Sequence, residues 1–140
     1  MTPLISHNLP PFWLWICLIA VFMLAATAQA SIVTLVPGQS IQEAIDAASP
    51  GDIIQISPGV YNESINITKS LILRGVMGED RPILNSGGHF SVVSILADNT
   101  GLEGLNLTGA DNGTMSGIRV MSRNNIIANN GGLLLTYHVF

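Results

Sequence analysis

Apolar and polar positions between residues 91 and 130 repeat with a period of 25 residues. When the chain is shifted by 25 positions, residues 91–102 lie over residues 116–127 without a gap, and Val93 falls on Ile118. Apolar residues therefore meet apolar residues wherever a buried face would need them. A period in this range indicates a solenoid, in which successive repeats stack on one another.

Each copy of the repeat contains short runs in which apolar and polar residues alternate, with Gly, Asn, Asp and Ser between the runs. None of the runs is long enough for a helix, so the pattern predicts strands joined by turns. It favours a parallel β-helix over a leucine-rich repeat, the other solenoid type that fits this period. At one bend Asn99 falls on Asn124, which predicts a ladder of stacked side-chain amides.

A third coil precedes these two copies. Residues 70–75 can be set over residues 99–104 at a spacing of 29, with the additional residues looped out around 77–82. Gly78 and Pro82 are the turn formers of that loop. The sequence thus shows three coils, and a fourth barely begins.

Residues 32–75 depart from the repeat and predict an N-terminal module. A strand and a turn come first, and a helix is expected over residues 41–48, where Ser40 and Glu43 have the spacing of a capping box. Residues 53–56 then predict a buried strand. The open end of a β-helix exposes its core and its unpaired strand edges, so we expect the helix to cap that end.

The beginning of the chain has the pattern of an export signal. Residues 12–26 are almost entirely apolar, and Ala28 and Ala30 place small residues two positions apart before Ser31. This is typical of a secretory signal peptide that is cut after Ala30. An uncleaved N-terminal anchor is the alternative, and residues 1–11 depart from the pattern in having no Lys or Arg. We expect a secreted, periplasmic or cell-surface protein that meets a membrane only through an uncleaved leader.

These features divide the chain into four parts. They are a signal peptide or anchor at 1–30, an N-terminal cap and first coil at 31–75, β-helix coils at 76–130, and an atypical tail at 131–140. The tail has neither an amphipathic cap nor a polar outer coil, so we expect the chain to be the front of a longer protein. The alternative is a tail that folds back as a cap. Uncapped ends also predict edge-to-edge self-association.

The charge of the chain argues against one class of partner and does not identify another. The chain has five basic and nine acidic residues and a formal net charge of −4, and its one cysteine, Cys17, lies within the leader. A mildly acidic chain without a basic cluster argues against nucleic acid as a partner.

Residues 39–48, 51–56, 58–61 and 67–75 resemble the N-terminal section of right-handed parallel β-helix proteins of the pectin-lyase-like superfamily. That section is shared by pectin methylesterases, by NosD-like periplasmic copper-maturation proteins and by many surface proteins of methanogenic archaea. The resemblance covers about residues 32–130. It implies an all-β fold, a right-handed parallel β-helix with a short N-terminal capping helix.

The chemistry of that superfamily does not carry over to this chain. The resemblance puts the first glutamine of the esterases at Met115 or Ser116, neither of which can hold an oxyanion, and their later Gln-Asp motif and arginine have no match. Asp98 and Asp111, the carboxylates near the repeat bends, are better explained as turn caps than as esterase groups. A lyase needs clustered acids, and no pair of acids shares a repeat position. Copper maturation needs grouped Met, His or Cys, which are scattered here. We predict no catalytic, cofactor-binding or metal-binding residues and no cofactor, and we expect the chain as it stands not to be an enzyme.

Two sets of residues remain as candidate sites. The candidate N-glycosylation sites are Asn62, Asn66, Asn106 and Asn112, each in an Asn-X-Ser/Thr sequon. The outward polar residues Ser94, Asn106 and Arg119 predict a ligand face for sugar hydroxyls. We therefore expect an exported module that binds polysaccharide or has a structural role. The alternatives are the N-terminal fragment of a pectinesterase-like or lyase-like enzyme and a NosD-like copper-maturation protein.

Overall fold

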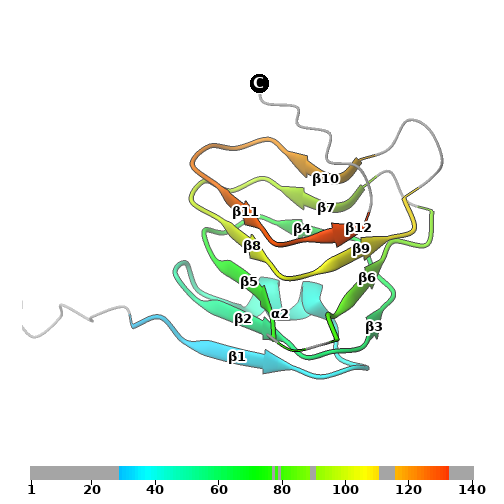
Figure 1. Cartoon of the computed structure of the whole chain (residues 1–140). Coiled ribbons are helices and arrows are strands. Elements are labelled where there is room, and N and C mark those ends of the chain that lie inside the picture. The colour runs from blue at the N-terminus through cyan, green and yellow to red at the C-terminus, as the bar shows by residue number, and fades with distance from the viewer. Residues whose placement is uncertain (1–28, 77, 79, 89–90, 111–115, 133–140) are drawn as a thin grey trace, which may run out of the picture.

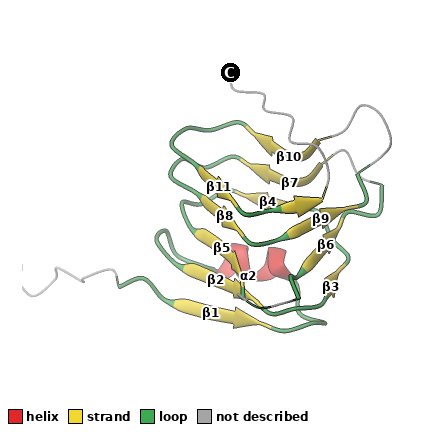
Figure 2. Cartoon of the chain, viewed as in Figure 1, coloured by secondary structure: helices red, strands yellow, loops and turns green. Residues whose placement is uncertain are grey.

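The fold is a parallel β-solenoid, which confirms the predicted class. The computed structural model describes residues 29–132, apart from residues 77, 79, 89–90 and 111–115. The strands form three parallel sheets, which the chain visits in turn (Figures 1 and 2). Sheet A consists of β1 (Ile32–Leu35), β2 (Ile53–Ile56), β5 (Ile72–Gly75), β8 (Gly101–Glu103) and β11 (Ile126–Ala128). Sheet B consists of β3 (Val60–Tyr61), β6 (Ile83–Asn85), β9 (Asn106–Thr108) and β12 (Gly131–Gly132), and sheet C of β4 (Ile65–Ile67), β7 (Ser91–Ile95) and β10 (Ser116–Val120). Helix α2 (Ile41–Ala47) lies between β1 and β2 in the sequence.

The register of the sheets confirms the predicted repeat. Ser116 pairs with Ser91, 25 positions earlier, and Ile72 pairs with Gly101 at the predicted spacing of 29. Two shorter turns come first, because β1 pairs with β2 at a spacing of 21 and β2 pairs with β5 at a spacing of 19. The solenoid therefore has more turns than the three coils predicted from the sequence. Its first turns differ in length and do not align with the later ones.

The core consists of inward-facing columns of aliphatic side chains. In sheet A, Ile54, Leu73 and Leu102 lie one above another on β2, β5 and β8, and each is fully buried. Val93 and Ile118 form the corresponding column on β7 and β10 in sheet C. Burial of one such side chain stabilises the fold by about 1.5–3 kcal/mol. These columns explain why the apolar positions of the sequence repeat.

Helix α2 takes the place of a sheet C strand in the first turn. It follows β1 and packs below β4, the first strand of sheet C (Figure 1). Ile41 and Ile45 face the core and are buried. The helix ends at Ala47, one residue earlier than predicted. It covers the lower end of sheet C, which is the capping role expected from the sequence.

The N-terminal end of α2 is held by a residue of the next turn. Ser40 Oγ accepts a hydrogen bond from the Glu43 amide at 3.2 Å, as the capping box predicts. The Glu63 carboxylate also binds this end of the helix, and its oxygens accept hydrogen bonds from the amides of Ile41 at 2.7 Å and Gln42 at 3.2 Å. A carboxylate at this position satisfies free amides and complements the helix dipole.

Side chains also satisfy backbone groups at the C-terminal end of α2 and at the edge of sheet C. Lys69 Nζ donates to the carbonyl oxygens of Asp46 at 2.6 Å and Ala48 at 2.8 Å. The side-chain amide of Gln42 pairs with the backbone of Asn66, accepting from its N–H at 2.8 Å and donating to its carbonyl oxygen at 3.3 Å. Gln42 thus imitates the neighbouring strand that β4 lacks on this side.

The predicted ladder of Asn99 and Asn124 takes a different form. The two residues occupy equivalent bends with φ angles of 56° and 57°, and their side chains are exposed. Among the contacts of the described residues, no hydrogen bond joins these two side chains. Asn tolerates the left-handed conformation, so the backbone explains why Asn recurs. A hydrogen bond between side-chain amides of successive turns occurs instead at Asn62, whose Oδ1 accepts from Asn85 Nδ2 at 3.1 Å.

The predicted leader, at residues 1–28, and residues 133–140 of the tail lie outside the described residues. Within the described ranges, no helix has the length and apolar character needed to cross a membrane.

Candidate ligand-binding site

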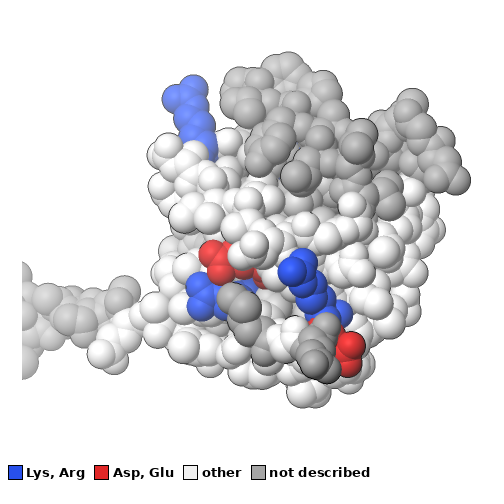
Figure 3. Space-filling view, in the orientation of Figure 1, with Lys and Arg blue, Asp and Glu red and all other residues white. Residues whose placement is uncertain are grey.

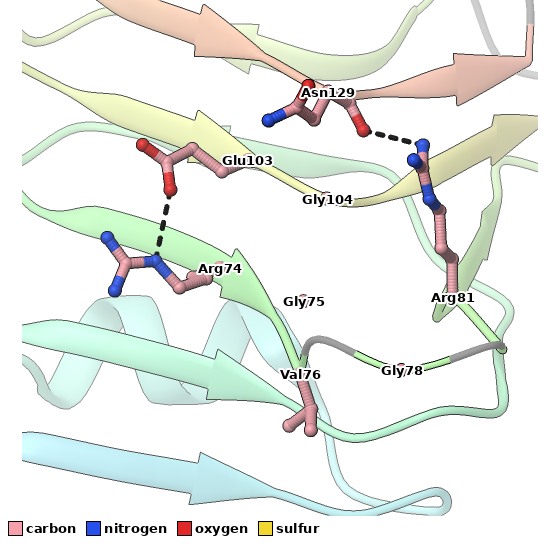
Figure 4. Close-up of a pocket in the computed structure, with 8 residues that line it drawn as sticks. All are labelled: Arg74, Gly75, Val76, Gly78, Arg81, Glu103, Gly104 and Asn129. Carbon is pink, nitrogen blue, oxygen red and sulfur yellow. Dashed lines mark hydrogen bonds and ion pairs between the residues drawn. The ribbon is translucent and has the colours of Figure 1, made fainter.

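A hollow of about 120 Å³ opens where the chain leaves sheet A for sheet B (Figure 4). Its walls come from three successive turns: β5 with the connection to β6, the end of β8, and the bend after β11. The residues that line it are Arg74, Gly75, Val76, Gly78, Arg81, Glu103, Gly104 and Asn129. The site is thus built across the stack of turns.

Two glycines separate the charged groups of the hollow. Gly75 ends β5, and Gly104 follows β8 in the next turn. A Cβ at Gly75 would overlap the carbonyl oxygen of Gly104, and Gly104 has a φ of 72°. Glycine satisfies both the close approach and the positive φ. Because neither residue has a side chain, the middle of the hollow stays open.

On one side of the glycines, Arg74 and Glu103 form an ion pair. They are register partners on β5 and β8, and Arg74 Nε donates to Glu103 Oε2 at 3.0 Å. The side chains are 40% and 26% exposed, respectively. The pair therefore presents donors and acceptors to solvent while each group fixes the other's position.

On the other side of the glycines, Arg81 reaches along the stack of turns. It lies in the connection before β6, and its Nη1 donates to the carbonyl oxygen of Asn129 at 2.6 Å, in the bend after β11. Figure 4 shows this arginine and the pair of Arg74 and Glu103 on opposite sides of Gly75 and Gly104. The hollow thus holds two cations and one anion in a chain of net charge −4.

The charged side chains on this face of the molecule gather mainly at the hollow. In Figure 3, blue and red groups lie together near the centre of the face, whereas most of the other described surface in view is uncharged. The concentration of charge distinguishes this region from the rest of the visible surface.

The ligand face predicted from the sequence is divided between two sheets. Arg119 pairs with Ser94 on β10 and β7 of sheet C, and the same row continues to Asn66 on β4. Asn106 lies on β9 of sheet B instead. The structure therefore brings Ser94 and Arg119 together, with Asn66 in place of Asn106.

The four sequon asparagines lie in different surroundings. Asn62 follows β3 and Asn66 lies within β4, and both are exposed. Asn106 is half-buried in β9. Asn112 lies outside the described residues. Access for a glycan is therefore best at Asn62 and Asn66 among the three that the structure describes.

The described residues bring no candidate metal ligands together. No group of three or more His, Cys, Asp or Glu side chains clusters within these ranges. Asp98 accepts a hydrogen bond from the Arg123 amide at 2.7 Å, which matches its predicted place at a bend. Asp111 and Met115 lie outside the described residues.

Among the residues that the structure describes, two groups have shifted pKa values, and neither lines the hollow. Hydrogen bonds from the backbone amides of Ser31 and Ser49 hold the pKa of Asp52 below its ordinary value of 3.8. Burial raises the pKa of Tyr61, whose hydroxyl donates to the carbonyl oxygen of Ser57 at 3.0 Å. Both shifts move titration away from neutral pH, so neither group is tuned for proton transfer there.

Comparison with known proteins shows a similarity to a cell surface glycoprotein. It comes from Methanothermus fervidus and is 38% identical over 76 residues, which cover 52% of this chain and 12% of that protein. No family model matches the chain, and no solved structure matches it. The relationship fits an exported β-solenoid of the cell surface.

The residues of the hollow were not predicted as a site from the sequence. One signal was present, because setting residues 70–75 over 99–104 places Arg74 opposite Glu103. No such signal joins Arg81 to Asn129, since they are 48 positions apart and meet through a backbone oxygen.

Proposed function

We propose that this chain is exported through its N-terminal leader and belongs to a surface solenoid that binds polysaccharide at the hollow lined by Arg74, Arg81 and Glu103. The similarity to a cell surface glycoprotein supports the location. The apolar run at residues 12–26 and the small residues before Ser31 support export. We also propose that the solenoid is right-handed and related to the pectin-lyase-like superfamily.

The observation that carries the binding proposal is the placement of two arginines on either side of bare glycine backbone. Sugar hydroxyls both donate and accept hydrogen bonds, and the hollow offers guanidinium donors next to the Glu103 carboxylate. An acidic sugar would gain more, because a carboxylate forms charge-assisted bonds with a guanidinium. Acidic polysaccharide is therefore the preferred ligand class.

The row of Asn66, Ser94 and Arg119 on sheet C is a weaker candidate for the same role. Its residues lie on successive strands, which are about 4.8 Å apart in a sheet. Ser94 Oγ is already hydrogen bonded to Ser91 Oγ at 2.9 Å. Asn66 is also a sequon asparagine, so a glycan at this position would cover the row. The hollow contains no sequon.

Affinity electrophoresis tests the proposal. The exported protein is run in native gels that contain polygalacturonate as an acidic polymer or dextran as a neutral one. We expect polygalacturonate to retard the protein and Arg74→Gln to weaken binding by about 10- to 100-fold, since a hydrogen bond to a charged group contributes about 1.5–3 kcal/mol. Arg81→Gln should have a similar effect.

Arg119→Gln is the matched control, because it removes the same charge from sheet C. It should leave the retardation unchanged. If neither polymer retards the unaltered protein, the binding proposal is overturned. A loss of binding with Arg119→Gln but not with Arg74→Gln would place binding on sheet C and overturn the assignment to the hollow.

A further inference from the structure

The carboxylate of Asp52 ties the start of the solenoid to its second turn. Oδ1 accepts a hydrogen bond from the backbone N of Ser31 at 2.8 Å, and Oδ2 accepts one from the amide of Ser49 at 2.7 Å. Asp52 is only 7% exposed. Both of its oxygens are therefore engaged by backbone donors at the lower end of the molecule.

Ser31 is the first described residue that the fold holds in place. Its N bonds to Asp52, and its carbonyl oxygen accepts from the amide of Ile53 at 2.8 Å. Gln29 and Ala30, like Ser31 itself, are exposed and lie before β1, so the two hydrogen bonds of Ser31 are what set it apart from them. The predicted leader cut between Ala30 and Ser31 thus falls directly before the residue that these bonds anchor.

We propose that cleavage of the Ala30–Ser31 bond leaves the α-ammonium group of Ser31 ion-paired with the Asp52 carboxylate, so that removal of the leader completes the N-terminal end of the solenoid. In this hydrolysis by a signal peptidase, water adds across the peptide bond. Ala30 leaves with a carboxylate, and the nitrogen of Ser31 becomes an amine that takes up a proton. The inference rests on export of the chain and does not depend on polysaccharide binding.

The charge change strengthens a bond that already has the right geometry. An N–H to carboxylate bond becomes charge-assisted at both ends when the donor is an ammonium group. The carboxylate should raise the pKa of the Ser31 amine above the usual range of about 7.7–8.0 for α-amino groups. A raised pKa in the folded state gives stability that is complete below the unfolded pKa and is lost as pH rises through the folded pKa.

The other charged groups near this site are few. Lys69 also contributes to the lowered pKa of Asp52, and its Nζ is bonded to the carbonyl oxygens of Asp46 and Ala48. The Asp46 carboxylate accepts from Gln42 Nε2 at 2.9 Å and lies on the exposed side of α2. Asp52 is therefore the acid that directly meets Ser31, and Asp46 is a suitable control.

The first test uses the exported protein without alteration. Mass spectrometry of its N-terminal peptide should show a chain that begins at Ser31. An NMR titration of the ¹⁵N-labelled α-amine should then give a pKa above the usual range for such groups. A chain that begins at another residue, or an amine that titrates within the usual range, would overturn the proposal.

Two variants separate the ion pair from a general effect of charge. Asp52→Asn should return the titration of the Ser31 amine to the usual range, whereas Asp46→Asn, which removes the same charge, should leave it raised. If Asp52→Asn does not fold, a chain that keeps Ala30 as its first residue serves instead, because its Ser31 nitrogen is a neutral amide. This chain should melt at a lower temperature than the chain beginning at Ser31 at pH 6, and equal melting temperatures would contradict the ion pair.

Discussion

Gly75 lies directly below Gly104 in the stacked turns, so close that a Cβ at position 75 would overlap the carbonyl oxygen of Gly104. The same Cβ would lie 3.0 Å from Pro82 Cγ. These contacts are with backbone and a rigid ring, neither of which can move aside at low cost. The close approach of the two turns therefore depends on glycine.

Gly75→Ala should destabilise the protein by about 1–3 kcal/mol, because the added methyl forces adjacent turns apart. Urea unfolding measures the change. Gly78→Ala is the matched control, since a Cβ there would meet nothing within 4 Å, and its effect should be small. Equal losses in the two variants would show that the turns are not packed as closely as described.

The free energy of unfolding should also fall when Glu63 loses its charge. Its carboxylate accepts from the amides of Ile41 and Gln42 at the start of α2, and glutamine would turn an NH₂ group toward these donors. Glu63→Gln should cost about 1 kcal/mol.

Glu43→Gln is the control for Glu63, because Glu43 lies in the first turn of the same helix and its side chain is exposed. This control removes the same charge from the first turn of the helix. If both variants lose the same stability, the effect is one of net charge and the cap assigned to Glu63 is wrong.

The later turns could be predicted from the sequence because each one repeats the columns below it. Val93 and Ile118 recur 25 positions apart since they fill the same column in sheet C. The first turns have no such signal, because α2 replaces a strand and the spacing changes. The role of Glu63 was equally invisible, as a cap supplied from the next turn has no fixed distance in the sequence.

The hollow shows a similar division. The pair of Arg74 and Glu103 follows from the register of two turns, which the sequence specifies. The contact of Arg81 with Asn129 spans two turns and depends on the path of an irregular connection. Local pattern predicts neighbours on paired strands, but it does not predict where a connecting loop places a side chain.

Backbone conformation explains the recurrence of Asn99 and Asn124, and substitution can test this. At a φ of 56°, Asn99→Ala should cost about 1–2 kcal/mol, because an alanine is strained in the left-handed region. Asn99→Gly should be close to neutral. If glycine is as damaging as alanine, the side-chain amide itself stabilises the bend, and the ladder predicted from the sequence regains support.

Acid should weaken the fold through Asp52. Its pKa is below the ordinary value of 3.8. The larger cause is the backbone hydrogen bond that Ser31 donates to the carboxylate, and the second is the one that Ser49 donates. A group whose pKa is lowered by folding stabilises the native state above its unfolded pKa, and this contribution disappears as pH falls through the folded pKa. We therefore expect stability to decline below about pH 4. Urea unfolding at a series of pH values should show a smaller decline for Asp52→Asn, while Asp46→Asn, in which the altered side chain is exposed and, among the described contacts, accepts only from the Gln42 side chain, controls for an ordinary loss of negative charge. If the two curves fall in parallel, the buried carboxylate does not anchor the N-terminal end of the solenoid.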